Sequence, residues 1–432
     1  MRKYLFLVLG AMSLGCWSCA VKPSTQVASP RLSPADSVNL YVQLTEVLDS
    51  QQLMGLSVVL MANHDIAWEG SWGWANYERR IPVSGTTAYR VASISKAVTA
   101  VALMQLAEQG KVDLYADVSL YLGWLLRHPS FPDSIITLDH LLSHRSGIRD
   151  GAAYSRFSRD MVAGQLDIRQ LFEQTGDYYA TDLFSEHAPG TYFSYTNCTW
   201  GLIATIVEKV SGERFDQFCR RHIFEPLGMQ ARFNVLDLQH LDELAVLYRF
   251  SDDQWVPQAD DYSIEAPLSR VDSLYRPGKN GLLFGPQGSL RSTAADLAVF
   301  ARMLMNEGNY EGVQVLEPSS VQSMMERHWV YQNGNGDTWE NFFLAYGYGI
   351  HHLTNTSGAD IIFPDRLMSG HPGIAYGLLS DMYFDKASGS GIIFITNGSK
   401  QEYAYGRQST FYLPEESVFE VIYPYLQKLE NP

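Results

Sequence analysis

The sequence predicts an α+β fold: a mainly antiparallel sheet, flanked by helices and built from both ends of the chain, with an inserted helical lobe. Strand-like apolar and aromatic runs occur near both ends, whereas most of the chain between them has helical spacing or forms long loops. Strands at both ends need partners, so a single sheet that combines them is the simplest arrangement. We expect one domain over 37–432, with a sheet lobe from 37–92 and 340–432 and a helical lobe over about 93–339.

The N-terminal part of this domain is predicted to be a helix followed by a hairpin. Apolar residues over 37–50 recur at helical spacing. The strand-like runs 56–61 and 66–74 follow, and Ala62-Asn63-His64-Asp65 between them is typical of a turn. From 93 to 109 the pattern becomes helical again, and Gly110 provides a stop signal.

The middle of the chain, to about residue 325, is expected to be mostly helical. Strand character returns at 346–353, 375–384 and 391–396, and 386–390 forms the turn of the last pair. A final helix over 415–429 would pack on the sheet, with a kink at Pro424.

Composition indicates a globular protein and excludes a nucleic-acid binder. The chain has 432 residues, of which 46% are hydrophobic and 12% aromatic, so it can bury a large core. Its formal net charge is −15, and no long run of lysine and arginine occurs that could follow a phosphate backbone.

The N-terminus indicates export. Met1, Arg2 and Lys3 are followed by an apolar stretch over 4–15, which is too short to span a bilayer but suits a secretion signal. The order Gly15-Cys16 resembles the lipobox of bacterial lipoproteins, and this resemblance implies a periplasmic protein anchored through a lipid on Cys16. Cys19 and plain signal cleavage remain alternatives. We therefore divide this part into a signal over 1–19 and a Pro/Ser-rich tether over 20–36.

Two cysteines remain in the body of the chain, Cys198 and Cys219. Both lie on apolar helical stretches, so they are interpreted as buried free thiols rather than as a disulfide framework.

The residues that point to chemistry are Ser93 and Lys96. A spacing of three on a helix places both side chains on one face, so the lysine amine can approach the serine oxygen. The N–H of Ser93 lies at the positive end of the helix dipole, where it can stabilise an oxyanion. Lys96 can act as a base only if burial lowers its pKa.

Five ordered segments resemble the serine β-lactamase and penicillin-binding-protein family, which includes class C β-lactamases, family VIII esterases and D,D-peptidases. Ser93-Ile94-Ser95-Lys96 resembles the S-x-x-K motif, Tyr195-Thr196-Asn197 the Y-x-N motif, and His371-Pro372-Gly373, opening a strand, takes the place of K-T-G. The segments 141–148 and 288–297 resemble two further family segments, and the resemblance covers about 38–400. It implies the β-lactamase/transpeptidase-like fold.

The resemblance also implies roles for these residues. Ser93 would be the acylated nucleophile, and Lys96 and Tyr195 would share the proton transfer. Asn197 would hold the substrate and orient Lys96, and the N–H of Ile374 would be the second oxyanion donor. His371 and Gly373 would complete the substrate-binding set. The implied protein is a serine hydrolase that acts on a small-molecule or peptide substrate: an ester, a β-lactam or a D-amino-acid peptide.

The third motif departs from the family pattern, because His371 replaces lysine and Pro372 replaces threonine. An unperturbed histidine titrates near pH 6.5, so His371 would attract a substrate carboxylate less than lysine does. We therefore expect esters or amides without a carboxylate to be preferred over benzylpenicillin. Proline is tolerated best on an edge strand.

The alternatives are a cell-wall D,D-carboxypeptidase and a penicillin-binding sensor that is acylated without turnover. No cofactor is expected. His140 and His144 are four residues apart, but the glutamate of a zinc-protease H-E-x-x-H is absent, so no metal site is expected either. The only expected contact with a membrane is through the N-terminal lipid.

Overall fold

A computed structural model describes residues 31–164, 166–238, 241–258, 275–401 and 404–430. Its main feature is a nine-stranded antiparallel sheet with the order β10-β11-β12-β13-β14-β15-β1-β2-β3. The strands are β10 (Trp329–Val330), β11 (Ala345–Tyr346), β12 (His351–His352), β13 (Ser369–Ala375), β14 (Leu378–Asp385), β15 (Ser390–Thr396), β1 (Gly55–Ala62), β2 (Asp65–Asn76) and β3 (Ile81–Pro82).

The two ends of the chain meet in the centre of this sheet. β1 pairs with β15 over its length, with Val58 opposite Phe394, and with β2 on its other side. The predicted α+β fold with a sheet built from both ends is therefore confirmed. Asn63 and His64 in the β1–β2 turn both have positive φ angles, as a two-residue turn that suits the twist of a hairpin requires.

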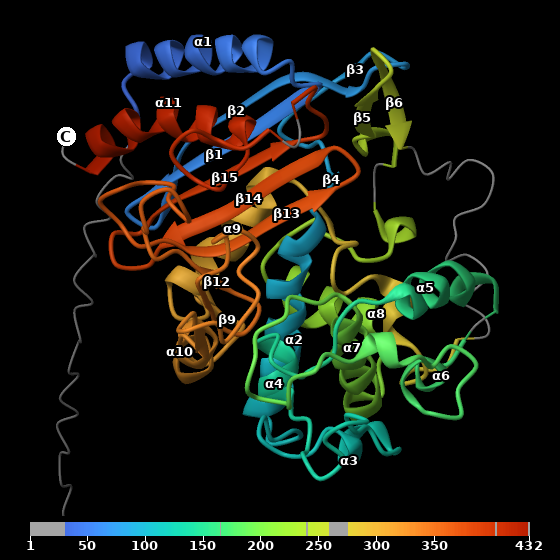
Figure 1. Cartoon of the computed structure of the whole chain (residues 1–432). Helices are drawn as coiled ribbons and strands as arrows, with labels where there is room; N and C mark the ends of the chain where they lie inside the picture. Colours follow the sequence, from blue (N-terminus) through green and yellow to red (C-terminus); the bar gives the residue numbers. More distant parts are fainter. Residues whose placement is uncertain (1–30, 165, 239–240, 259–274, 402–403, 431–432) are drawn as a thin grey trace, which may run out of the picture.

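Helices cover both faces of the sheet (Figure 1). α1 (Pro34–Ser50) and α11 (Leu413–Glu430) pack on one face, and α9 (Ala294–Met305) packs on the other, against β1, β14 and β15. Side chains alternate along β1 accordingly. Leu56 and Val58 belong to the core beneath α1 and α11, whereas Val59 and Met61 belong to the core shared with α9. Pro424 lies inside α11.

The rest of the chain forms a helical lobe around α2 (Ser95–Glu108), whose residues 95–106 are all buried. Gly110, with a φ of 67°, follows the end of α2, as its position in the sequence predicts. The other helices are α3 (Ser119–Leu122), α4 (Leu138–Leu142), α5 (Ala152–Gly164), α6 (Arg169–Phe172), α7 (Cys198–Ser211), α8 (Phe215–Cys219) and α10 (Pro318–Met325).

Among the described residues, three two-stranded ladders lie outside the main sheet, and five of their six strands fall in the stretch that we expected to be mostly helical. They are β4 (Tyr89–Arg90) with β7 (Arg291–Ser292), β5 (Leu247–Ser251) with β6 (Gln254–Gln258), and β8 (Asn309–Tyr310) with β9 (Val313–Gln314). The β4–β7 pair fixes the segment that precedes Ser93, because Tyr89 pairs with Ser292. The strands of the β4–β7 and β8–β9 pairs have two residues each, too few to carry a periodicity that a sequence pattern could reveal.

The bounds predicted for two C-terminal strands are wrong. The run 346–353 is two short strands, because Gly349 has a φ of 66° and approaches the backbone oxygen of Lys96 so closely that a Cβ would lie 2.9 Å from it. The run 375–384 begins before the true strand, since Tyr376 and Gly377 form a turn with positive φ angles. His371-Pro372-Gly373 therefore lies inside β13, the preceding strand, and does not open a strand.

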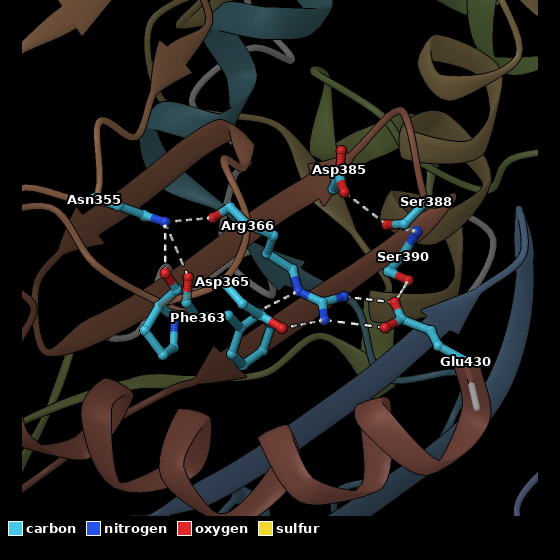
Figure 2. A network of polar contacts seen from close by, with 9 residues as sticks. Asn355, Phe363, Asp365, Arg366, Asp385, Ser388, Ser390 and Glu430 are labelled. Atoms are coloured by element: carbon cyan, nitrogen blue, oxygen red, sulfur yellow. Dashed lines mark hydrogen bonds and ion pairs between the residues drawn. The ribbon is translucent and has the colours of Figure 1, made fainter. Parts of the chain in front are cut away.

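A polar network joins the end of α11 to the start of β15 (Figure 2). The Arg366 guanidinium forms hydrogen bonds with both carboxylate oxygens of Glu430, and it also pairs with Asp365. Glu430 in turn accepts a hydrogen bond from the hydroxyl of Ser390, at the start of β15. Side chains from a loop, a strand and the last helix thus meet at one point.

Cys198 and Cys219 are buried free thiols, as predicted. Cys16 and Cys19 lie outside the described residues, as do the expected signal and most of the expected tether. Within the described ranges, no helix is both long enough and apolar enough to cross a membrane.

Candidate active site

Ser93 lies in a short 3-10 helix, Ala92–Ile94, that leads directly into α2. Ala92 has a φ of 45°, so the chain turns sharply just before the serine. The hydroxyl of Ser95 holds this turn in place: it donates to the Ala92 carbonyl (2.6 Å) and accepts from the backbone N–H of Leu290 (3.1 Å). Ser93 is thereby presented at the beginning of the helix, with its own N–H in the first turn.

Lys96 lies one turn along, and its amine contacts the serine. Its Nζ donates to Ser93 Oγ (3.0 Å), to Asn197 Oδ1 (2.8 Å) and to the carbonyl oxygen of Gln287 (2.9 Å). The side chain is completely buried. Burial lowers the pKa of Lys96 to about 7, although the negative charge of Asp150 opposes this shift.

Tyr195 is the third group at the serine. Its ring lies 4.9 Å from Lys96 Nζ, and it forms a hydrogen bond with Ser93. Burial raises the pKa of the Tyr195 hydroxyl, while that hydrogen bond opposes the shift. The ring stacks on Phe343 (4.9 Å between centroids) and meets the edge of Trp339 (5.0 Å), so aromatic packing fixes its position.

Asp150 is a central residue of the site that sequence reasoning missed. Its carboxylate accepts hydrogen bonds from the backbone N–H groups of Asn197 and Cys198, where α7 begins, and from the side-chain amide of Asn197 (2.8 Å). Asn197 is thus held with its oxygen toward Lys96. Asp150 follows the 141–148 segment, but no spacing rule connects it with a helix that begins 48 residues later.

His371 is not among the residues that line the cavity in front of Ser93, where we expected it to bind substrate. It is fully buried, and its two ring nitrogens lie 2.8 Å from the Tyr346 hydroxyl and 2.6 Å from the carbonyl oxygen of Pro372. Burial, together with the nearby charge of Lys96, holds the pKa of His371 well below its usual value. The expected titration near pH 6.5 is therefore wrong. Alternation along β13 explains the placement, because His371 and Gly373 share the face directed at the 3-10 helix.

Gly373 allows that close approach. A Cβ at Gly373 would lie 2.4 Å from Ser380 Oγ and 2.5 Å from the carbonyl oxygen of Val91, so only glycine fits between β13 and the turn before Ser93. Pro372 and Ile374 point to the other face and line the cavity in front of Ser93. Pairing with β12 ends at Gly370, so Pro372 lies on an open edge of β13, where proline is tolerated.

The two histidines weighed as metal ligands have structural roles. His140 completes the capping of α4 with Thr137. Nδ1 of His144 accepts the backbone N–H of Thr196 (3.1 Å), and its ring packs on Tyr195 (4.4 Å), which supports the Y-x-N segment from behind. Within the described residues, no group of three or more His, Cys, Asp or Glu side chains could hold a metal ion.

The cavity in front of Ser93 has a volume of about 460 Å³. Tyr195, Asn197, Pro372 and Ile374 line it together with Ser93. Two arginines stand at its rim: the guanidinium groups of Arg90 and Arg249 both lie 5.2 Å from the centroid of the Tyr376 ring. The cavity therefore contains cationic groups, which the third motif alone did not indicate.

This arrangement can carry out acyl transfer. It holds a hydroxyl nucleophile, a buried amine whose pKa is lowered to about 7, so that part of it is neutral near that pH, and a phenol that can pass a proton on. Ser93 lies in the 3-10 helix and Ile374 in β13, and both residues line the cavity.

Comparisons with known proteins point to one family. The Beta-lactamase family model matches residues 43–411. A D-aminopeptidase from Gluconobacter oxydans is 26% identical over 58% of this chain and 42% of its own length. Penicillin-binding protein 4 from Amycolatopsis lactamdurans is 26% identical over 74% of each chain. The matches to the first curated relatives cover less than half of those relatives' own lengths.

The fold is also that of solved structures. The octameric penicillin-binding protein homologue from Pyrococcus abyssi superposes with a TM-score of 0.66 over 91% of this chain and 78% of that one, at 23% identity. The chain therefore shares its overall fold with that structure.

Proposed function

Since the chain belongs to the beta-lactamase family, we propose that it is an exported serine hydrolase that forms an acyl-enzyme on Ser93. The observation that carries the proposal is the contact of 3.0 Å between Ser93 Oγ and the amine of Lys96, whose pKa is lowered to about 7. A neutral amine at this distance can take the serine proton at neutral pH. The acyl donor would be an ester, a β-lactam or a D-amino-acid peptide, and a D-aminopeptidase among the relatives supports the last of these.

The reaction begins with a bond between Ser93 Oγ and the acyl carbon. The serine proton passes to Lys96 and Tyr195, and the negative charge on the acyl oxygen is stabilised by the N–H groups of Ser93 and Ile374. Collapse of this intermediate breaks the bond to the leaving atom, which takes up the proton. Water then attacks the acyl-enzyme, with the same Lys96 and Tyr195 pair as base, and restores the free serine.

The roles of the surrounding residues follow from their contacts. Asn197 accepts a hydrogen bond from Lys96 and is itself held by Asp150, so it orients the amine beside the serine. His371 lies behind the site between Tyr346 and the Pro372 carbonyl, so we assign it a positioning role.

Covalent labelling tests the nucleophile. A fluorophosphonate probe should attach once per chain, on the peptide that contains Ser93, and S93A should lose esterase activity by roughly a thousandfold or more. S417A is a matched control, because Ser417 lies on α11, where its hydroxyl donates to the Leu413 carbonyl, and it lines neither cavity near Ser93. Labelling of S93A at the wild-type rate would contradict the proposal.

Turnover separates the alternatives. Continuous release of product from a short ester marks a hydrolase, and release of D-alanine from a D-Ala-D-Ala peptide marks a D,D-carboxypeptidase. A single stoichiometric burst, with a stable adduct on Ser93, would instead mark a penicillin-binding sensor.

We also propose a lipid anchor on Cys16, on the strength of the charged start, the short apolar stretch and the Gly15-Cys16 order. Expressed from its full reading frame in a bacterium, the protein should fractionate with membranes, and C16S should release it. An intact mass that shows an unlipidated N-terminus beyond Cys19 would refute the anchor.

A further inference from the structure

A second cavity, of about 260 Å³, adjoins the one that contains Ser93. The two cavities share the side chains of Trp339, Phe342, Ile374 and Tyr412 as lining. The second is walled mainly by aromatic rings, including Tyr405, and two acids line it: Glu340, which is exposed, and Glu415, which is buried. A group bound at Ser93 could extend into this space.

The position of Tyr195 indicates which part of a substrate would enter it. In the proposed reaction, the proton from Ser93 passes through Lys96 and Tyr195 to the leaving atom, so the leaving group must lie on the Tyr195 side. The Tyr195 ring contacts Trp339, which lines both cavities. The adjoining cavity is therefore placed to hold the leaving group.

Glu415 gives this cavity an unusual charge environment. It is 2% exposed and lies against Asp381 of β14, which is fully buried, and the two carboxyl groups share a hydrogen bond. The backbone N–H of Tyr412 donates to Glu415 (2.6 Å). Among the described residues, neither carboxyl group forms an ion pair with a lysine, arginine or histidine, and no donor other than the Glu415 carboxyl contacts the oxygens of Asp381.

Two buried carboxyl groups without a cation form an environment that a positive ligand stabilises and a negative ligand destabilises. Aromatic walls reinforce this preference, because ring faces attract ammonium groups. Burial raises the pKa of both carboxyl groups, and the neighbouring Glu415 raises that of Asp381 further. These shifts favour the protonated forms, which explains how the fold tolerates the pair. An ammonium group would replace the proton as the partner of the pair.

We propose that this cavity is the leaving-group subsite and that Glu415 makes it select leaving groups that carry an amine, against those that carry a carboxylate. The proposal rests on the proposed acyl transfer at Ser93 and adds the substrate class. It makes Glu415, rather than His371, the reason to expect that substrates with a carboxylate bind less well. Acylation releases the leaving group as an alcohol or phenol after the bond between acyl carbon and leaving oxygen breaks.

A matched series of phenyl acetates tests it. Each ester has the same acetyl group and a para substituent that ends in an ammonium, a methyl or a carboxylate group, joined to the ring through the same ethylene spacer. All three form the same acetyl-enzyme, so kcat/KM compares acylation alone. We expect the ammonium ester to exceed the methyl ester by about tenfold or more, and the carboxylate ester to be the slowest.

The variant E415Q should bring the ammonium-to-methyl ratio close to one. E420Q is the control, because Glu420 is exposed on the same helix and bonds to Gln408 outside the cavity. A ratio that E415Q leaves unchanged would overturn the role of Glu415. Should E415Q fail to fold, the wild type alone decides: the free amine-bearing phenol should inhibit at lower concentration than its methyl and carboxylate counterparts.

The outcomes distinguish this proposal from the proposed function. If no ester is hydrolysed and fluorophosphonate does not label Ser93, the proposed serine hydrolase function itself is contradicted. Hydrolysis of all three esters at equal rates would remove only the leaving-group subsite. Preference for the carboxylate ester would overturn the proposal and would indicate that Arg90 and Arg249 at the cavity rim determine the charge preference.

Discussion

At the scale of single residues, the protonation state of Lys96 determines whether Ser93 can react. The amine is completely buried, and the two oxygens that it meets besides Ser93, on Asn197 and Gln287, belong to neutral groups. Asp150 supplies the nearby negative charge, but Asn197 separates it from the amine. Desolvation therefore outweighs the charge, and the amine loses its proton near neutral pH.

This balance predicts the pH dependence of acylation. Because the pKa of Lys96 is lowered to about 7, the neutral base predominates above that pH, and kcat/KM should rise between about pH 6 and 8. His144 and His371 do not account for such a rise, since burial holds the pKa of each well below its usual value, so both stay neutral in this range. The profile should be measured with a neutral ester.

Substitution of Asp150 should shift the pH profile of kcat/KM in a known direction. Its negative charge raises the pKa of Lys96, so D150N should shift the acid limb to lower pH even where overall activity falls. A loss of activity without a shift would assign Asp150 a purely structural role at the start of α7. A wild-type profile that is flat from pH 5.5 to 8.5, roughly one and a half pH units either side of the Lys96 value, would contradict the assignment of Lys96 as base.

At the scale of elements, the site forms where the starts of two helices meet one strand. The 3-10 helix before α2 presents Ser93, the start of α7 presents Asn197, and β13 closes the site with Gly373 against the turn. Asp150 joins a loop to α7 through backbone hydrogen bonds. Changes in any of these contacts would move Ser93 relative to Lys96.

Sequence patterns predicted the elements that are determined locally. The β1–β2 hairpin and α2 each carry their own periodicity and stop signals, so their ends were predicted to within a few residues. The break between β11 and β12 was missed because Gly349 turns there to pack on Lys96, a contact between distant parts of the chain. The β5–β6 hairpin was missed within a stretch that we interpreted as helices and loops.

The same distinction applies to the site. The contact of Ser93 with Lys96 follows from a spacing of three on one helix, and the sequence predicts it directly. The side of β13 on which His371 lies depends on register with β14, and strand alternation moves it behind the site. Glu415 and Asp381 come together only when α11 docks on the sheet, so no motif contains them.

At the scale of the whole molecule, the two ends of the described chain pack against each other over one face of the sheet. α1 packs beside α11, and both cover the core formed by β1, β14 and β15 (Figure 1). The first turn of α11 carries Glu415 toward the leaving-group cavity, and its last turn carries Glu430 to Arg366. The packing of α11 on the sheet therefore affects both the stability of the sheet lobe and the shape of that cavity.

The pair formed by Arg366 and Glu430 should therefore stabilise the fold measurably. Their side chains are 9% and 17% exposed, the second contact between them is 3.0 Å, and Ser390 also donates to Glu430. R366M leaves a largely buried carboxylate without its cation, so we expect the free energy of unfolding to fall by about 1.5–3 kcal/mol. E430Q should cost less, because Asp365 still pairs with Arg366.

Thermal and urea unfolding of R366M, E430Q and the double variant measures this coupling, provided that the urea m-value stays constant. The matched control is D36N, which removes the exposed ion pair between Asp36 and Lys428 that also joins α1 to α11. It should change stability much less, since solvent screens both charges. Fluorophosphonate labelling of Ser93 at low temperature should stay normal in all of these variants, because none of the residues lines either cavity. Equal losses of stability in R366M and D36N would show that burial of the Arg366 pair contributes nothing, and the seating of α11 would then depend on its apolar face alone.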